Sequence, residues 1–69
     1  MERISVSSSN IASIGYDPDS LTLEIEFNNG SIYQYFDVSQ RIYEDLINSD
    51  SVGGFLASNI KGSYRFSKV

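Results

Sequence analysis

The chain lacks the residues on which much protein chemistry depends. Its 69 residues include no cysteine, no histidine and only one proline. The absence of cysteine excludes disulfides and thiolate metal sites. Because the commonest general base is also missing, a serine nucleophile would have to be activated by a lysine or a carboxylate. We therefore expect no enzyme activity, no metal ion and no cofactor.

Long apolar runs are missing as well. No segment approaches the ~20 apolar residues that a membrane-spanning helix needs, and the first ten residues, MERISVSSSN, hold no apolar run of signal-peptide length. These features predict a soluble, cytoplasmic protein without a membrane partner. With 41% hydrophobic residues, residues 1–69 are expected to form one small domain with a thin core.

Positive charge is scarce and unevenly placed. The net charge of −4 argues against a generic nucleic-acid binder, because phosphate contacts need a surplus of lysine and arginine on some face. Residues 1–50 hold all nine acids and two bases, a balance of −7, whereas residues 51–69 hold three bases and no acid. The three bases, Lys61, Arg65 and Lys68, form either a small basic site or an ordinary solvated tail.

Three runs have the alternation of apolar and polar residues that is typical of strands. The first places Ala12, Ile14 and Tyr16 on one face. In the second, LTLEIEF, the core side holds Leu21, Leu23, Ile25 and Phe27. A type I turn over DPDS (17–20) would set Tyr16 opposite Leu21 and bring these two apolar faces together. A short run near the N-terminus, ISV, indicates an additional edge strand.

The third run contains Tyr33 and Tyr35, and their direction depends on the loop NNG (28–30). A two-residue turn would place both tyrosines on the solvent-exposed face of the sheet and bury Gln34. A three-residue loop with Gly30 in the left-handed conformation shifts the register by one residue, which turns every side chain to the other face. We favour the three-residue loop, because it exposes Gln34.

This register gives both tyrosines apolar partners. It sets Tyr33 opposite Ile25 and Tyr35 opposite Leu23. Its cost is that Ile32 and Phe36 fall on the outer face, where a terminal segment would have to cover them partly.

After the strands the apolar period becomes helical. The segment DVSQRIYEDLINSD predicts a helix, with Asp37 and Gln40 or Ser39 alone capping its start. A second helix is expected from Ser51 to Ile60, ending at Lys61 and a left-handed Gly62. The tail SYRFSKV predicts a short final strand. The fold class is therefore α+β: an antiparallel meander of three to four strands, two helices on one face and a short C-terminal strand.

Two acidic pairs have the spacing of functional sites, but each has a simpler explanation. Glu24 and Glu26 lie roughly 6.5–7 Å apart along a strand, near the inverting-glycosidase spacing, yet on an open wet face. Asp17 and Asp19 resemble the first ligands of a calcium loop whose other ligands are missing, and suit a turn around Pro18.

Aromatic residues near cations are the best candidate for a binding site. The candidate residues are Tyr64, Arg65, Lys61, Tyr33 and Tyr35. Aromatic faces and a few bases on a sheet suit single-stranded RNA, which is held by stacking and by phosphate neutralisation. The alternative is that these rings belong to the core, and that the domain instead docks a protein partner through Ile32 and Phe36.

The sequence resembles the KTSC domain, a short bacterial and phage module. The similarity lies in the segments SSSNIASIGYDPDSLTLEIEF, YQY and NIKGSYRF, and covers almost the whole chain. The matching positions are Ser8 or Ser9, Ile11, Ile14, Gly15, Tyr16, Asp17, Gly30, Tyr33, Tyr35, Ser51, Gly53, Phe55, Ile60, Lys61, Gly62 and Tyr64.

The resemblance implies a binding module. The KTSC domain also occurs at the C-terminal end of some lysyl-tRNA synthetases, which suggests RNA as a partner. Family members often carry bases between Ser51 and Tyr64, where this chain keeps only Lys61. If RNA binds through that segment, the resemblance implies weak, salt-sensitive binding here.

Overall fold

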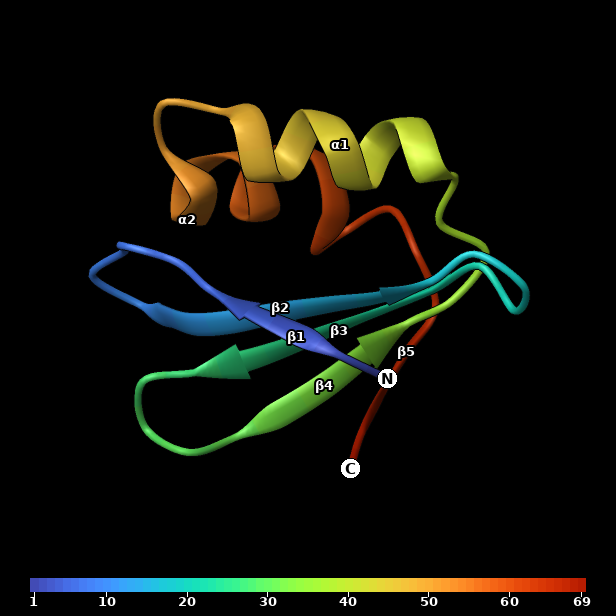
Figure 1. Cartoon of the computed structure of the whole chain (residues 1–69), viewed down its shortest axis with the longest axis horizontal. Helices are drawn as coiled ribbons and strands as arrows, with labels where there is room; N and C mark the ends of the chain where they lie inside the picture. The colour runs from blue at the N-terminus through green and yellow to red at the C-terminus, as the bar shows by residue number, and fades with distance from the viewer.

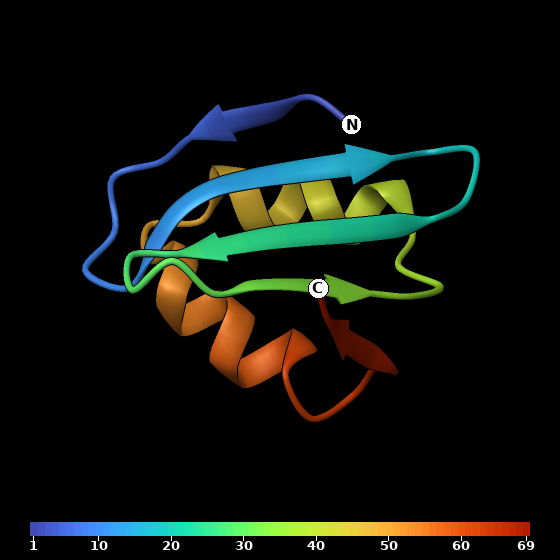
Figure 2. The same ribbon diagram turned by 90° about the horizontal axis from the view of Figure 1, so that it is seen from below.

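The computed structural model describes residues 1–69 and contains one five-stranded antiparallel sheet with its helices on one face (Figure 1). The strands are β1 (Arg3–Ser5), β2 (Ile11–Asp17), β3 (Thr22–Phe27), β4 (Ile32–Tyr35) and β5 (Phe66–Lys68). Their spatial order follows their order in the sequence. Figure 2 shows the strands side by side, with β1 and β5 at the two edges.

The N–H of Phe27 donates to the carbonyl oxygen of Ser31 at 2.8 Å, so Phe27 pairs with Ser31 and residues 28–30 form a three-residue loop. The favoured register is therefore confirmed. Tyr33 pairs with Ile25, and Tyr35 pairs with Leu23. Gly30 has a φ of 91°, the left-handed conformation that such a loop requires. Gln34 lies on the outer face, where its side-chain amide donates to Glu24 at 2.9 Å.

The helical layer is capped by serines. In α1 (Gln40–Asn48), the hydroxyl of Ser39 accepts from the backbone N–H of Ile42, which confirms the cap by Ser39 alone. In α2 (Val52–Phe55), Ser51 accepts from the N–H of Gly54. A single π-helical turn, η1 (Leu56–Ile60), continues α2. The predicted α+β class is confirmed.

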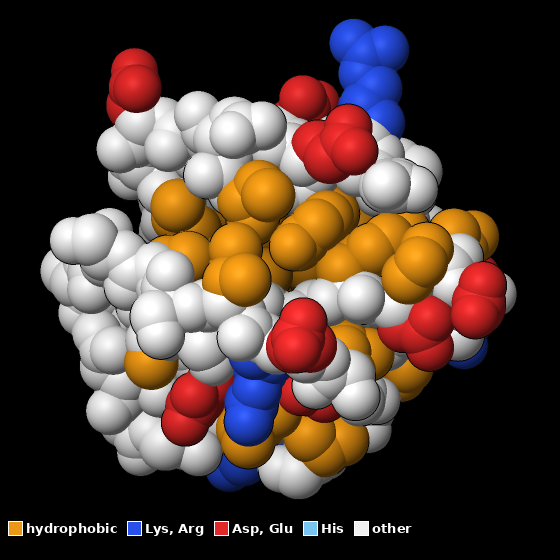
Figure 3. Space-filling model, in the orientation of Figure 1, with side chains coloured by type: hydrophobic (Ala, Val, Ile, Leu, Met, Phe, Trp, Pro, Cys, Tyr) orange, Lys and Arg blue, Asp and Glu red, His pale blue; other side chains and the backbone are white.

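The core lies between the helices and the inner face of the sheet. Its nine buried hydrophobic side chains are Ile11, Ile14, Leu23, Ile25, Tyr35, Val38, Leu46, Leu56 and Ile60. Half-buried rings extend it, because Tyr16 of β2 stacks on Tyr43 of α1 at 4.8 Å between centroids. Figure 3 shows hydrophobic side chains along the seam between the helical layer and the sheet.

Two predicted core positions in the first hairpin were wrong. Tyr16 pairs with Leu23 rather than Leu21, so the turn extends to Leu21, which has a φ of 54° and is 40% exposed. At the other end, a β-bulge inserts Ala12 between the paired residues Ile11 and Ser13. Ile11 therefore takes the core position that alternation assigned to Ala12.

The predicted left-handed Gly62 was also wrong, because Gly30 is the glycine with positive φ. The chain instead leaves η1 through a π-type hydrogen bond. The N–H of Lys61 donates to the carbonyl oxygen of Leu56 at 2.9 Å. Ser63 then donates to Ile60 at 3.0 Å, so the exit is right-handed.

The N-terminal strand lies against a glycine of β2. A Cβ atom on Gly15 would stand 2.7 Å from Cγ of Arg3 and 3.1 Å from the carbonyl oxygen of Glu2. We expect Gly15→Val to displace β1 and lower the free energy of unfolding by about 1–3 kcal/mol, as overpacking does. Chemical denaturation measures this change.

Gly62→Ala is the matched control, because a Cβ there would meet nothing within 4 Å. It should change the free energy of unfolding by less than about 1 kcal/mol. Equal effects of the two substitutions would contradict the account of the N-terminal strand.

Candidate aromatic binding site

The helices do not cover the whole inner face of the sheet. Leu23, Ile25 and Tyr35 are buried beneath them, whereas Phe27 and Tyr33 remain half-exposed and Phe66 is 56% exposed. An open hollow of about 350 Å³ lies where the cover ends. We call it the aromatic hollow; its lining residues are Phe27, Asn29, Ser31, Tyr33, Tyr35, Lys61 and Phe66.

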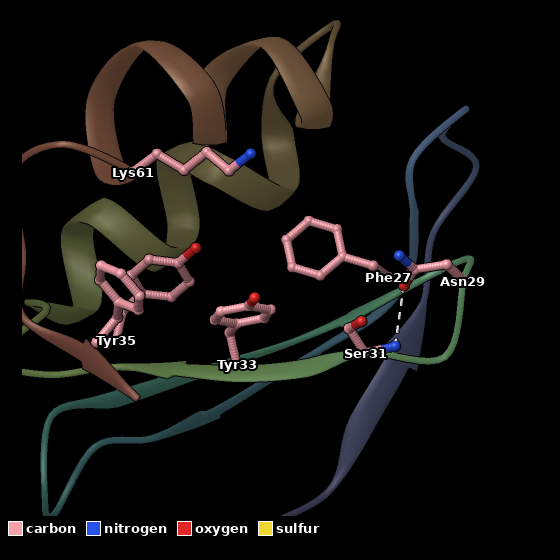
Figure 4. Close-up of a pocket in the computed structure, with 7 residues that line it drawn as sticks. Phe27, Asn29, Ser31, Tyr33, Tyr35 and Lys61 are labelled. Atoms are coloured by element: carbon pink, nitrogen blue, oxygen red, sulfur yellow. Dashed lines mark hydrogen bonds between the residues drawn. The ribbon is translucent and has the colours of Figure 1, made fainter. Parts of the chain in front are cut away.

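Lys61 reaches over this hollow from the helical layer (Figure 4). It follows η1, whose last residue, Ile60, is fully buried and so fixes the point where the side chain leaves the backbone. Its Nζ atom lies 5.8 Å from the centroid of the Phe27 ring, within cation–π range. The ammonium group is therefore held above aromatic surface.

The rings of the hollow contact one another across three strands. Tyr33 meets Phe27 edge to face at 5.7 Å and Phe66 at 5.9 Å between centroids. Phe66 also lies 5.9 Å from Tyr35. Burial, with a smaller contribution from the neighbouring Tyr33, raises the pKa of the Tyr35 hydroxyl. Tyrosine is protonated at neutral pH even without this shift, so the Tyr35 hydroxyl can both donate and accept a hydrogen bond.

No acidic residue lines the hollow, although the chain holds nine acids. The arginines are paired with acids elsewhere: Arg3 with Glu24 and Glu26, Arg41 with Asp45, and Arg65 with Asp37. Lys61 and Lys68 make no salt bridge. Directly paired strand residues share a face, so Lys68, opposite Tyr33, lies on the side of the hollow. Both unpaired lysines are thus beside the aromatic rings.

The structure brings together three of the five candidate residues, Lys61, Tyr33 and Tyr35. Arg65 lies apart, with a nitrogen 3.0 Å from the Asp37 carboxylate and its guanidinium over the Phe36 ring. Tyr64 is half-buried and packs against the core.

The five candidate residues did not include Phe27, Phe66, Asn29 and Ser31, which also line the hollow. Phe66 could be recognised from the sequence, since it alternates with Tyr64 in the tail SYRFSKV. Phe27 could not, because a strand-end phenylalanine is indistinguishable from a core residue until the extent of the helical cover is known.

The outer face of the sheet is a polar network. Ser13 donates to Glu26 at 2.7 Å, and Arg3 lies 3.5 Å from Glu24. The carboxylate of Asp17 accepts hydrogen bonds from the hydroxyl of Ser20 and the N–H of Asp19, and these lower its pKa, as expected of a turn-forming carboxylate. No cluster of acidic side chains suited to a metal ion is present. None of the helices is long and apolar enough to cross a membrane.

The proposed protein-docking residues, Ile32 and Phe36, are both half-buried. The C-terminal segment runs beside them, since the N–H of Phe36 donates to Arg65 and that of Val69 donates to Ile32, each at 2.9 Å. The partial cover that the favoured register required is therefore supplied by this segment.

Similar proteins share both sequence and fold with this chain. A KTSC domain protein of Yersinia pestis has a crystal structure that is 43% identical, with a TM-score of 0.93, and the match covers 99% of this chain and 96% of that one. An uncharacterized protein of Stutzerimonas stutzeri is 40% identical over 53 residues, which cover 77% of this chain and 75% of that protein.

Longer relatives contain a similar segment. A lysine–tRNA ligase of a Nostoc species is 39% identical over 54 residues, which cover 78% of this chain but only 10% of the ligase. The model of the KTSC domain matches residues 7–64. The chain belongs to the KTSC domain family.

Proposed function

We propose that this domain is a non-catalytic binding module that holds single-stranded RNA in the aromatic hollow. Bases would stack on the half-exposed ring of Tyr33 and the exposed ring of Phe66, and Lys61 and Lys68 would neutralise phosphates. Stacking and phosphate neutralisation are the two contributions on which single-strand binding depends.

The distribution of charge carries the proposal. The two lysines without an acidic partner lie beside a hollow that no acid lines, although the whole chain is acidic. An anionic ligand with flat rings fits this combination. The relatives named lysine–tRNA ligase add support, because their name includes an RNA as substrate.

A protein-docking module is the alternative, with less support. Ile32 and Phe36 are half-buried, and Arg65 lies over the ring of Phe36. The exposed Phe66 belongs to the hollow rather than to this outer patch.

The affinity for a labelled ten-nucleotide RNA of mixed sequence, measured over a range of salt concentrations, tests the proposal. If two lysines contact phosphates, the slope of log affinity against log salt should be about −1.4. Lys61→Gln removes one of the two phosphate contacts, so the slope should change from about −1.4 to about −0.7. Affinity at low salt should fall about fivefold, because one pair of opposite charges in contact in water contributes about 1 kcal/mol.

Arg41→Gln is the control, because it also removes one charge but from an exposed position on α1, where it faces Asp45. It should change the affinity much less. Equal losses in both variants would mean that only net charge matters. No RNA binding at low salt would favour the docking alternative.

A further inference from the structure

A second hollow of about 360 Å³ adjoins the first. Its lining residues are Ser9, Asn10, Phe27, Asn28, Asn29 and Lys61. Three of these, Phe27, Asn29 and Lys61, also line the aromatic hollow. The two hollows therefore form one strip, and Lys61 belongs to both halves of it.

The second hollow has a different chemistry from the first. It contains one ring, three asparagines and no acid. Asn28 holds the loops together, since its amide donates to the carbonyl oxygens of Ser8 and Ser9 at 3.3 and 2.9 Å. Asn29 accepts from the N–H of Ser31 at 3.0 Å through its side-chain oxygen, which leaves its NH₂ group free (Figure 4). The side chain of Asn10 makes no hydrogen bond within the chain.

Free side-chain amides can donate to and accept from the edges of unpaired bases. Stacking, in contrast, accepts any base. The strip thus offers a ring-lined half that tolerates every base and an amide-lined half that can select one. The single cation shared by both halves suits the phosphate that joins two nucleosides.

We infer that the strip binds two consecutive nucleotides of single-stranded RNA. One base stacks on Tyr33 and Phe66, the linking phosphodiester lies at Lys61, and the edge of the second base meets the amides of Asn10 and Asn29. This inference rests on the proposed function and adds the size of the binding unit and the place where bases are discriminated.

Two ligands of equal charge test the inference. Adenosine 5′-methylphosphate and the dinucleotide ApA each carry one negative charge, but only ApA brings a second base. We expect ApA to bind at least about fivefold tighter in an NMR titration at low salt, the lower end of what one further base contact contributes. ApA should also change the chemical shifts of Asn10, whereas the mononucleotide should not change them.

Asn10→Ala should reduce the advantage of ApA, because it removes one of the two amides at the second base, and leave mononucleotide affinity unchanged. Asn48→Ala, at the exposed end of α1, is the control and should preserve the advantage. Equal affinities of the two ligands for the parent protein would overturn the inference. So would binding of the ten-nucleotide RNA without binding of either small ligand, although RNA binding itself would then stand. If no ligand binds, both proposals fail.

Discussion

Tyr35→Ala should leave most of the protein unfolded at 25 °C. Tyr35 is 3% exposed and belongs to the core, where it pairs with Leu23 across β3 and β4. Truncation of a core aromatic residue costs about 3–5 kcal/mol. Because a domain of this size rarely has more than about 3–5 kcal/mol of stability, the loss approaches the total. Thermal unfolding followed by circular dichroism measures it.

Tyr35→Phe separates the ring from its hydroxyl. The hydroxyl makes no hydrogen bond within the chain, so this variant should remain folded with a melting temperature close to that of the parent protein. If Tyr35→Ala unfolds cooperatively with a melting temperature within error of that of the parent protein, Tyr35 is not part of the core and the register is wrong.

Phe66→Ala should lower RNA affinity by roughly 5- to 150-fold, since a stacked base contributes about 1–3 kcal/mol. Phe66 lies in the aromatic hollow, is 56% exposed and touches both Tyr33 and Tyr35. Its removal takes away ring surface that a base can reach. Fluorescence anisotropy with the ten-nucleotide RNA measures the change.

Stability should fall less in this variant than in Tyr35→Ala, because an aromatic pair contributes about 0.5–1.5 kcal/mol beyond its buried area. Phe36→Ala is the matched control, as it removes a phenylalanine that does not line the hollow. If Phe36→Ala weakens RNA binding as much as Phe66→Ala, the ligand does not bind in the hollow.

The strand register could be predicted because one polar residue decided it. Gln34 between two tyrosines makes one register bury an amide and the other expose it, and the exposed alternative is the observed one. The serine caps were also readable, since Ser39 and Ser51 stand immediately before helical patterns. In each case the deciding physics is local to a few residues.

The errors arose where the exact pairing of two strands, or the exact length of a turn, decides the conformation. Alternation cannot show the bulge at Ala12, which depends on how β2 pairs with β3. Leu21 adopts a positive φ because the turn closed by Asp17 extends through it into β3. The right-handed exit at Gly62 follows from the π-helical turn before it.

The site itself required the three-dimensional structure. Sequence analysis selected Lys61, Tyr33 and Tyr35 from their residue types, but gave the same weight to Arg65, which is paired with Asp37. The hollow exists because η1 ends above the sheet before β4 and β5 are fully covered, and no local pattern encodes where that cover ends.

The most direct test is an NMR titration of isotope-labelled protein with a short single-stranded RNA of mixed sequence, at low and then near-physiological salt. We expect chemical-shift changes centred on Tyr33, Phe66 and Lys61 that fade as salt rises. The absence of changes at low salt would contradict this expectation, as would changes confined to Ile32 and Phe36 that salt does not alter.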